Sequence, residues 1–339
     1  MTERNGSYVH GVATAPLIGE PIGSYFDRTA ASRPDREALV ARHQGIRWTW
    51  GELRERVDAC AAGLLALGLE PGDRVAIWAQ NRAEWAVVQF ATAKAGLVLV
   101  NINPAARAAE LREYLNLVGA RALVLQDRFK TSDYIAMMRE LVPELDGARP
   151  GALRSQAIPS LANVIHLGDE PVAGMLRFDE LSGLASESDH RRLDEIAGII
   201  QFDDPVDIQF SSATGARPAG ATLTHHNILN NGIVIGRTLR LGESDRVCIP
   251  VPLFHCFGMV MGNMACLAHG ATMIYPDDAF DPGTTLATIA EERCTACYGV
   301  PAMFIGMLEH EEFAGDDLSS LRTCVMGVSP CPIETMNNV

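Results

Sequence analysis

The segment after residue 210 has the composition of a phosphate-binding loop. It consists of Ser211, Ser212, Ala213, Thr214, Gly215, Ala216, Arg217, Pro218, Ala219 and Gly220. The pattern places it between an expected strand at 208–210 and an expected helix after Thr224. Backbone N–H groups and hydroxyls of such a loop can surround a phosphate, and a following helix N-terminus adds a favourable field. Its composition fits a flexible polar turn equally well.

Three other patterns have weaker support as chemical sites. The glycines of 215–220 have the spacing of a Walker A loop, but Ala221 stands where that loop requires lysine. Residues 327–331 look like a nucleophile elbow without its final glycine. Cys294 and Cys297 have redox or zinc spacing, but no second ligand pair supports a metal. Two buried thiols at the start of a strand are the favoured interpretation.

Charge and length exclude several classes of protein. The chain has 339 residues, with 28 basic and 42 acidic side chains and a net charge of −14. This balance argues against a nucleic-acid binder. The only lysines are Lys94 and Lys130, which excludes chemistry that needs a lysine ammonium in residues 131–339. We see no signal peptide, and the apolar stretch 258–275 is broken by polar residues, so we expect no transmembrane segment and a cytoplasmic location.

Alternating helix and strand signals predict the elements that must position these residues. Thr49 and Glu52 form a capping-box pattern before a helix, and Asn81 and Glu84 suggest a second helix cap. Short apolar runs between the helices are typical of a parallel sheet covered on both faces. The predicted strands are 75–78, 97–100, 122–125, 164–167, 208–210, 246–251, 271–275, 295–300 and 322–326.

The fold class is therefore predicted as α/β, with two successive lobes and mostly parallel sheets. Residues 1–22 form a leader, and 23–200 form a first lobe with an irregular connector near 146–194. Residues 201–339 form a second lobe that carries the loop. A helix is expected from Pro332, with no strand after it, so the second lobe is expected to be incomplete.

Several motifs in order resemble the adenylate-forming (AMP-binding) superfamily, and most of all its medium- and long-chain fatty-acyl-CoA ligases. The loop resembles the family sequence S-G-T-T-G-x-P-K-G, and A-T-L-T-H-H-N follows it as in those ligases. The resemblance covers nearly the whole chain, from about residue 19. The other matching segments are 48–53 (WTWGEL), 71–75 (PGDRV), 101–104 (NINP), 252–259 (PLFHCFGM), 298–301 (YGVP) and 327–332 (GVSPCP).

The resemblance implies a two-step reaction. A fatty acid carboxylate attacks the α-phosphate of ATP, with Mg²⁺ screening charge, and the thiol of coenzyme A then displaces AMP. The resemblance assigns the acyl pocket and carboxylate to Phe254, His255, Gly258, Tyr298 and Gly299. It assigns the adenine to Gly327, Val328, Ser329 and Pro330. His225 and His226 match positions at a helix start and are expected to be structural.

The loop departs from the family pattern where phosphate binding is most sensitive. Ala213 and Ala216 replace glycines, Gly215 replaces threonine, and Ala219 replaces lysine. Alanine at a positive φ costs about 1–2 kcal/mol, and loss of a charged hydrogen bond costs about 1.5–3 kcal/mol. Arg217 could substitute in part for the lysine charge. Val328 also replaces a glycine, which would crowd the adenine.

The family pattern also continues beyond residue 339, with a Y-G-x-T-E motif, a ribose-binding aspartate and a C-terminal lid domain. We therefore expect the chain to be an N-terminal portion with no catalytic residue confidently retained, no metal ligand, and little or no ligase activity. A separate chain could supply the lid domain. Two alternatives stay open: a non-catalytic acyl- or nucleotide-binding protein, and a truncated remnant without a folded function.

Overall fold

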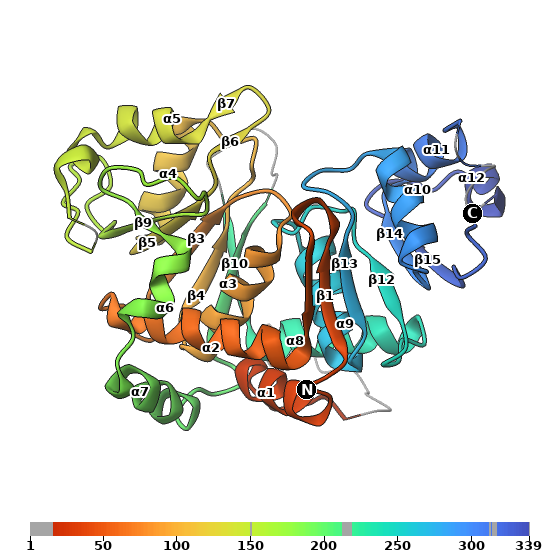
Figure 1. Cartoon of the computed structure of the whole chain (residues 1–339), viewed down its shortest axis with the longest axis horizontal. Helices are drawn as coiled ribbons and strands as arrows, with labels where there is room; N and C mark the ends of the chain where they lie inside the picture. The colour runs from red at the N-terminus through yellow and green to blue at the C-terminus, as the bar shows by residue number, and fades with distance from the viewer. Residues whose placement is uncertain (1–15, 150, 212–218, 312, 314–316, 339) are drawn as a thin grey trace, which may run out of the picture.

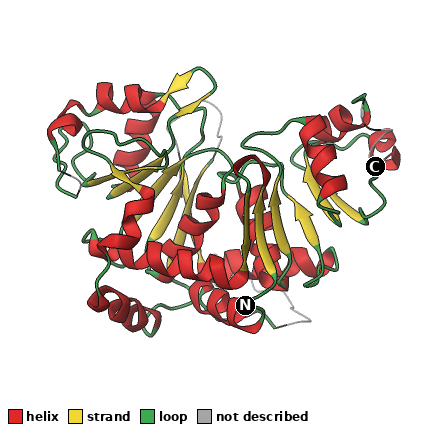
Figure 2. Cartoon of the chain, in the orientation of Figure 1, coloured by secondary structure: helices red, strands yellow, loops and turns green. Residues whose placement is uncertain are grey.

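The computed structural model describes residues 16–149, 151–211, 219–311, 313 and 317–338. These residues form two large sheets with helices between and outside them (Figures 1 and 2). The six-stranded sheet has the order β15 (Thr323–Met326), β14 (Ala296–Gly299), β12 (Arg246–Cys248), β13 (Thr272–Tyr275), β1 (Glu37–Ala41), β2 (Ile46–Thr49). The seven-stranded sheet has the order β11 (Gly220–Thr224), β10 (Pro205–Phe210), β4 (Val98–Asn101), β3 (Arg74–Trp78), β5 (Ala122–Leu125), β8 (Asn163–His166), β9 (Leu176–Arg177).

Most neighbouring strands run parallel, which confirms the predicted mixed α/β class. The exceptions in the two large sheets are the antiparallel pairs β1–β2 and β10–β11. The sheets do not follow the expected boundary at residue 200. The hairpin of β1 and β2, which the sequence did not predict, joins the six-stranded sheet through β13. Strand β10 joins the seven-stranded sheet through β4. Each sheet therefore takes strands from both halves of the chain.

Three apolar clusters define the layers. The largest fills the space between the sheets and includes residues of α1, α2, α3, α8 and α9. The second packs α4 and α5 on the outer face of the seven-stranded sheet, and the third packs α10 and α11 on the outer face of the six-stranded sheet. The α-helices are α1 (Ile22–Ser32), α2 (Trp50–Ala66), α3 (Ala83–Lys94), α4 (Ala108–Val118), α5 (Tyr134–Leu141), α6 (Leu181–Leu184), α7 (Glu187–Ala197), α8 (His225–Thr238), α9 (Ala265–His269), α10 (Pro282–Glu291), α11 (Pro301–Leu308) and α12 (Ile333–Asn338).

Shorter elements complete the fold. A small hairpin of β6 (Arg128–Phe129) and β7 (Ser132–Asp133) lies beside α5. A π-helix, Phe257–Met264, leads directly into α9. The 3₁₀ turns are Arg42–Gln44, Pro143–Gly147 and Phe178–Glu180. Within the described part of the chain, no helix is both long and apolar enough to cross a bilayer.

The two predicted helix caps have different outcomes. Thr49 and Glu52 form the capping box at the start of α2, with Glu52 N donating to Thr49 Oγ1 at 3.2 Å and Thr49 N donating to Glu52 Oε2 at 2.8 Å. The second cap is wrong, because Arg82 occupies the N-cap of α3 without a side-chain bond. The Asn81 side chain instead donates to Val251 O and accepts from Leu253 N. It therefore joins the two sheets, a long-range role that a local pattern does not reveal.

The eight cysteines are free thiols, and the interpretation of Cys294 and Cys297 as buried thiols is confirmed. Both are fully buried, and Cys297 pairs in register with Cys248 and Cys324 on the adjacent strands. Burial raises the pKa of Cys248 well above its ordinary value. Among the described residues, no group of three His, Cys, Asp or Glu side chains is placed to hold a metal ion.

Candidate functional site

The predicted phosphate loop is closed at its base by strand pairing. Ser211 N donates to Ala219 O at 2.9 Å, and Phe210 pairs with Gly220 in the β10–β11 hairpin. The ring of Phe210 stacks on Tyr114 of α4, with centroids 4.3 Å apart. Residues 212–218 lie outside the described residues. The structure thus fixes where the loop leaves and re-enters the sheet.

The expected helix N-terminus does not lie at this loop. Strand β11, which the sequence did not predict, runs antiparallel to β10 before α8 begins at His225. His225 N donates to Asp204 O next to the start of β10, whereas the loop leaves after Ser211 at the other end of that strand. Six residues of strand span about 20 Å. The α8 N-terminus, whose field falls off within a turn, therefore lies too far from the point where the loop leaves the sheet to act on an anion there.

His255 lies in a tight turn between β12 and the π-helix. Its backbone N donates to Pro252 O at 3.2 Å, and its Nδ1 accepts a hydrogen bond from Phe257 N at 3.1 Å. Partial burial lowers the pKa of the imidazole, so it is neutral at pH 7. With Nδ1 acting as an acceptor, the proton of the neutral ring is on Nε2. The exposed His255 side chain therefore offers an uncharged hydrogen-bond donor.

Gly258 sets the shape of this turn. A Cβ at Gly258 would lie 2.4 Å from Pro252 O and 2.9 Å from Leu253 Cα, distances that only a backbone shift could relieve. The ring of the next-door Phe257 stacks on Tyr298 of β14 at a centroid distance of 5.8 Å. The turn is thereby packed against the strand that carries the second predicted acyl-pocket segment.

The remaining predicted segments are the last two residues of β14 and the residues that follow β15. Tyr298 is fully buried and its hydroxyl has no partner among the described residues, and burial raises its pKa. Gly327 N donates to Gly299 O at 3.3 Å, which joins the two segments. Because β12, β14 and β15 are parallel neighbours, the segments at 254–258, 298–299 and 327–330 all lie at or beyond the carboxyl ends of one sheet. The structure brings these predicted residues to one edge.

Val328 adopts a backbone conformation that suits glycine. Its φ is +75°, in the left-handed region, and its side chain is 70% exposed. Ser329 and Pro330 beside it are also exposed. The valine that departs from the family pattern is therefore strained in its backbone, whereas the sequence reading predicts crowding of a ligand.

The carboxyl ends of both sheets meet around a cavity of about 260 Å³. Phe254, half-buried, is the predicted acyl-pocket residue that lines it. The charges in its wall are those of Lys130 and Asp278, and burial together with Asp277 raises the pKa of Asp278. The sequence motifs predicted no role for Lys130 or Asp278. The other lining residues are Gln80, Asn81, Asn103, Pro104, Phe129, Pro250, Pro252, Ala279, Phe280 and Met303.

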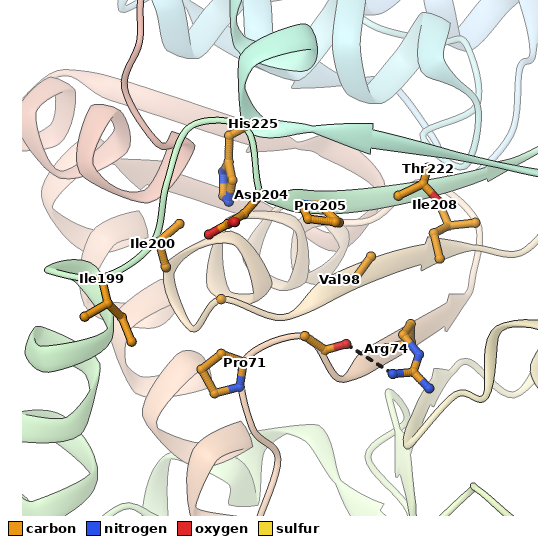
Figure 3. A pocket seen from close by; sticks show the side chains of 12 residues that line it. Pro71, Arg74, Val98, Ile199, Ile200, Asp204, Pro205, Ile208, Thr222 and His225 are labelled. Atoms are coloured by element: carbon orange, nitrogen blue, oxygen red, sulfur yellow. Dashed lines mark hydrogen bonds between the residues drawn. The ribbon is translucent and has the colours of Figure 1, made fainter.

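Another cavity, of about 440 Å³, lies at the opposite, amino ends of β3, β4 and β10 (Figure 3). Pro71, Val98, Ile199 and Ile200 give it apolar walls, and none of the predicted site residues lines it. In open α/β sheets ligands bind outside the carboxyl ends of the strands. The carboxyl-end cavity, whose wall includes Pro252 and Phe254 of the His255 turn, is therefore the candidate site.

Two mostly parallel sheets, with a loop and three connecting segments gathered at their carboxyl ends, define an α/β domain of the kind that binds small molecules across a strand edge. The family described as "AMP-binding enzyme" matches residues 26–339. The chain belongs to the AMP-binding enzyme family.

Curated relatives are similar over nearly the whole chain. "Medium-chain acyl-CoA ligase ACSF2, mitochondrial" from Macaca fascicularis is 42% identical over 340 residues, which is 98% of this chain and 54% of the relative. "Putative acyl-CoA synthetase YngI" from Bacillus subtilis (strain 168) is 42% identical over 325 residues, which is 96% of this chain and 59% of the relative. The chain thus spans little more than half the length of these relatives.

Solved structures share the fold. The inhibitor-bound N-terminal domain of FACL13 from Mycobacterium tuberculosis has a TM-score of 0.77 at 26% identity, covering 94% of this chain and 72% of that one. The anthranilate CoA ligase AuaEII in complex with anthranoyl-AMP has a TM-score of 0.77 at 22% identity, covering 95% and 57% of the two chains. The second likeness is one of fold alone.

Proposed function

We propose that this chain carries the acyl- and nucleotide-binding half of a fatty-acid–CoA ligase, which activates a medium- or long-chain acid with ATP and passes the acyl group to coenzyme A. The observation that carries the proposal is the cavity at the carboxyl ends of both sheets, which Phe254 beside the His255 turn lines and which lies at the end of the sheet where the loop leaves β10. The 42% identity to a medium-chain acyl-CoA ligase supports the class of substrate.

The described residues suggest how an acyl-adenylate would be held. The alkyl chain would contact the cavity wall around Phe254 and Met303. The neutral His255 would donate from Nε2 to the acyl oxygen without adding a charge. The backbone of Gly327, which has open space on its Cα, would face the adenine. The phosphates would be held by the loop between Ser211 and Ala219.

Among the described residues, no preformed cluster of protein side chains is available to Mg²⁺. Mg²⁺ prefers carboxylate, carbonyl and water oxygens in an octahedral arrangement, and no described cluster of three acidic, histidine or cysteine side chains is placed to bind one. We therefore assign no step to a protein-bound metal. At the loop, Ala219 supplies no positive charge where the family pattern has lysine.

Calorimetric titration with a non-hydrolysable medium-chain acyl-adenylate analogue tests the proposal. We expect saturable binding that His255→Ala weakens about two- to twelvefold, the value of one hydrogen bond of about 0.5–1.5 kcal/mol. His190→Ala, an exposed histidine on α7, is the matched control and should leave the affinity unchanged. Absence of binding by the folded wild-type chain would overturn the proposal.

A second candidate function is binding without catalysis. Ala219 in place of lysine and the strained Val328 favour it, because both weaken the contacts that the family pattern makes with nucleotide. Pyrophosphate release with a panel of fatty acids separates the two. Binding of the analogue without pyrophosphate release supports a non-catalytic protein, whereas measurable release supports the ligase.

A further inference from the structure

A buried polar cluster lies in the strand pair that leads to the loop. Asp207 of β10 is 1% exposed and Asn101 of β4 is 2% exposed. Asn101 Nδ2 donates to Asp207 Oδ2 at 2.7 Å. Gln209, two residues along β10, pairs in register with Asn101, so the three side chains lie on one face of the sheet.

The cluster leaves two buried acceptors without a donor. Asn101 Oδ1 and Asp207 Oδ1 both lack a hydrogen-bond partner, and so does Gln209 Nε2. An unsatisfied buried acceptor costs about 1–3 kcal/mol, and an unpaired buried carboxylate costs more. An ionised Asp207 could gain a donor only from the Gln209 amide, which already acts on its pKa. It would still leave Asn101 Oδ1 unsatisfied, since a carboxylate and an amide oxygen cannot bond to each other without a proton.

Among the described residues, the surroundings of Asp207 offer no charge to balance its own. The adjoining cavity, about 10 Å³, is at the lower limit for one water and has apolar walls that include Ile22, Leu99, Ile228, Met259 and Met264. Gln89 of α3 is the other polar residue in its wall, and its amide is committed to Met259 O and Asn263. The titratable neighbour that interacts with Asp207 is the Cys256 thiol, which carries no positive charge.

We propose that Asp207 carries a proton and forms with Asn101 a cyclic carboxylic acid–amide pair that fixes the end of β10 from which the phosphate loop leaves. In this pair Asn101 Nδ2 donates to Asp207 Oδ2, and the Asp207 hydroxyl donates from Oδ1 to Asn101 Oδ1. One proton thereby satisfies both orphaned acceptors. Burial raises the pKa of Asp207 to about 7, although the amides of Asn101 and Gln209 partly offset the effect.

The pair makes Asp207 a positioning residue. Ser211 begins the loop four residues after Asp207, and β10 is held against β4 through this face. Loss of the proton places a negative charge in the apolar interior and breaks one arm of the pair. We therefore expect the loop to hold phosphate less well above pH 7. This consequence depends on the proposed nucleotide binding, but the protonated pair itself does not.

The replacement Asp207→Asn isolates the effect of the Asp207 proton on stability. An asparagine amide can make the same cyclic pair with Asn101, with N–H in place of O–H, and cannot ionise. The unfolded carboxyl titrates near pH 4 and the folded one near 7, so the native state binds one more proton between these values. The stability of the wild type must therefore fall with rising pH in this window and level off above it.

The decisive measurement is the unfolding equilibrium constant of wild type and Asp207→Asn, from denaturant titrations between pH 5 and 8.5. The ratio of wild-type to variant constant should rise about tenfold per pH unit from 5 to about 7 and then stay constant. Titrations common to both proteins, including that of His225, cancel in this ratio. A ratio independent of pH would overturn the proposal.

Two further readouts keep the test valid if the variant folds poorly or binds no nucleotide. The carboxyl carbon of ¹³C-labelled aspartate in the wild type should show one residue that titrates near pH 7, and titration of every aspartate below pH 5 refutes the pair. AMP affinity should decline with pH in the wild type and stay constant in Asp207→Asn. If neither protein binds AMP while the unfolding ratio rises as expected, the proposed function fails and the protonated pair stands.

Discussion

The replacement Gly258→Ala tests whether the His255 turn is built around a close backbone contact. The added Cβ would lie 2.4 Å from Pro252 O and 2.7 Å from Pro252 C. An ordinary contact of this kind is longer than 3 Å, so either the π-helix or the Pro252 segment must move by more than half an ångström. Because the opposing atoms are backbone, no side-chain rotation can relieve the contact.

The size of the effect follows from opposing contributions. Overpacking of a well-packed site costs about 1–3 kcal/mol, and this contact lies at the severe end. Replacement of glycine by alanine within a helix favours folding by about 1 kcal/mol, since the unfolded chain loses conformational entropy. We expect Gly258→Ala to lower the free energy of unfolding by about 2 kcal/mol. At about 2.1 cal/mol/K of unfolding entropy per residue, this is a fall in Tm of about 3 °C.

Gly327→Ala is the matched control for this experiment. Both glycines belong to segments predicted to line the site, but a Cβ at Gly327 meets nothing within 4 Å and its φ is not in the left-handed region. Denaturant and thermal unfolding should show Gly327→Ala unchanged or more stable by up to about 1 kcal/mol. Equal stabilities of the two variants would refute the argument from backbone contact.

Two other substitutions test strain and buried charge. Val328→Gly should stabilise the chain by up to about 1 kcal/mol in denaturant unfolding. Glycine adopts a left-handed φ without strain, and this gain outweighs the larger conformational entropy of glycine in the unfolded chain. Val328→Ala should give a smaller gain. Lys94→Met should destabilise by about 1–3 kcal/mol, since Lys94, 8% exposed, is bonded to both Asp27 and Asp58 while solvent partly screens these carboxylates. Lys130→Met, at an exposed lysine, should leave unfolding unchanged.

Local patterns predicted the parts of the fold that depend on near neighbours. The Thr49 capping box needs only residues within one turn, and the predicted strand 75–78 is apolar throughout. Strand β11 was missed because Gly220–Thr224 has mixed polarity and half-exposed side chains. Its omission led to the wrong position for the α8 N-terminus. The pairing of β1 with β13, more than 200 residues apart, leaves no local signal either.

The candidate site shows the same division between local and long-range information. Motif resemblance located the segments around His255, Tyr298 and Gly327, which are contiguous in sequence. It matched the segment 101–104 without giving Asn101 a role, and it gave no sign of Asp207, because their importance lies in which polar atoms stay unsatisfied after β4 and β10 pair. From the sequence alone, an Asp within an apolar strand is predicted to face solvent. The position of the phosphate loop can therefore depend on a proton that the loop sequence does not encode.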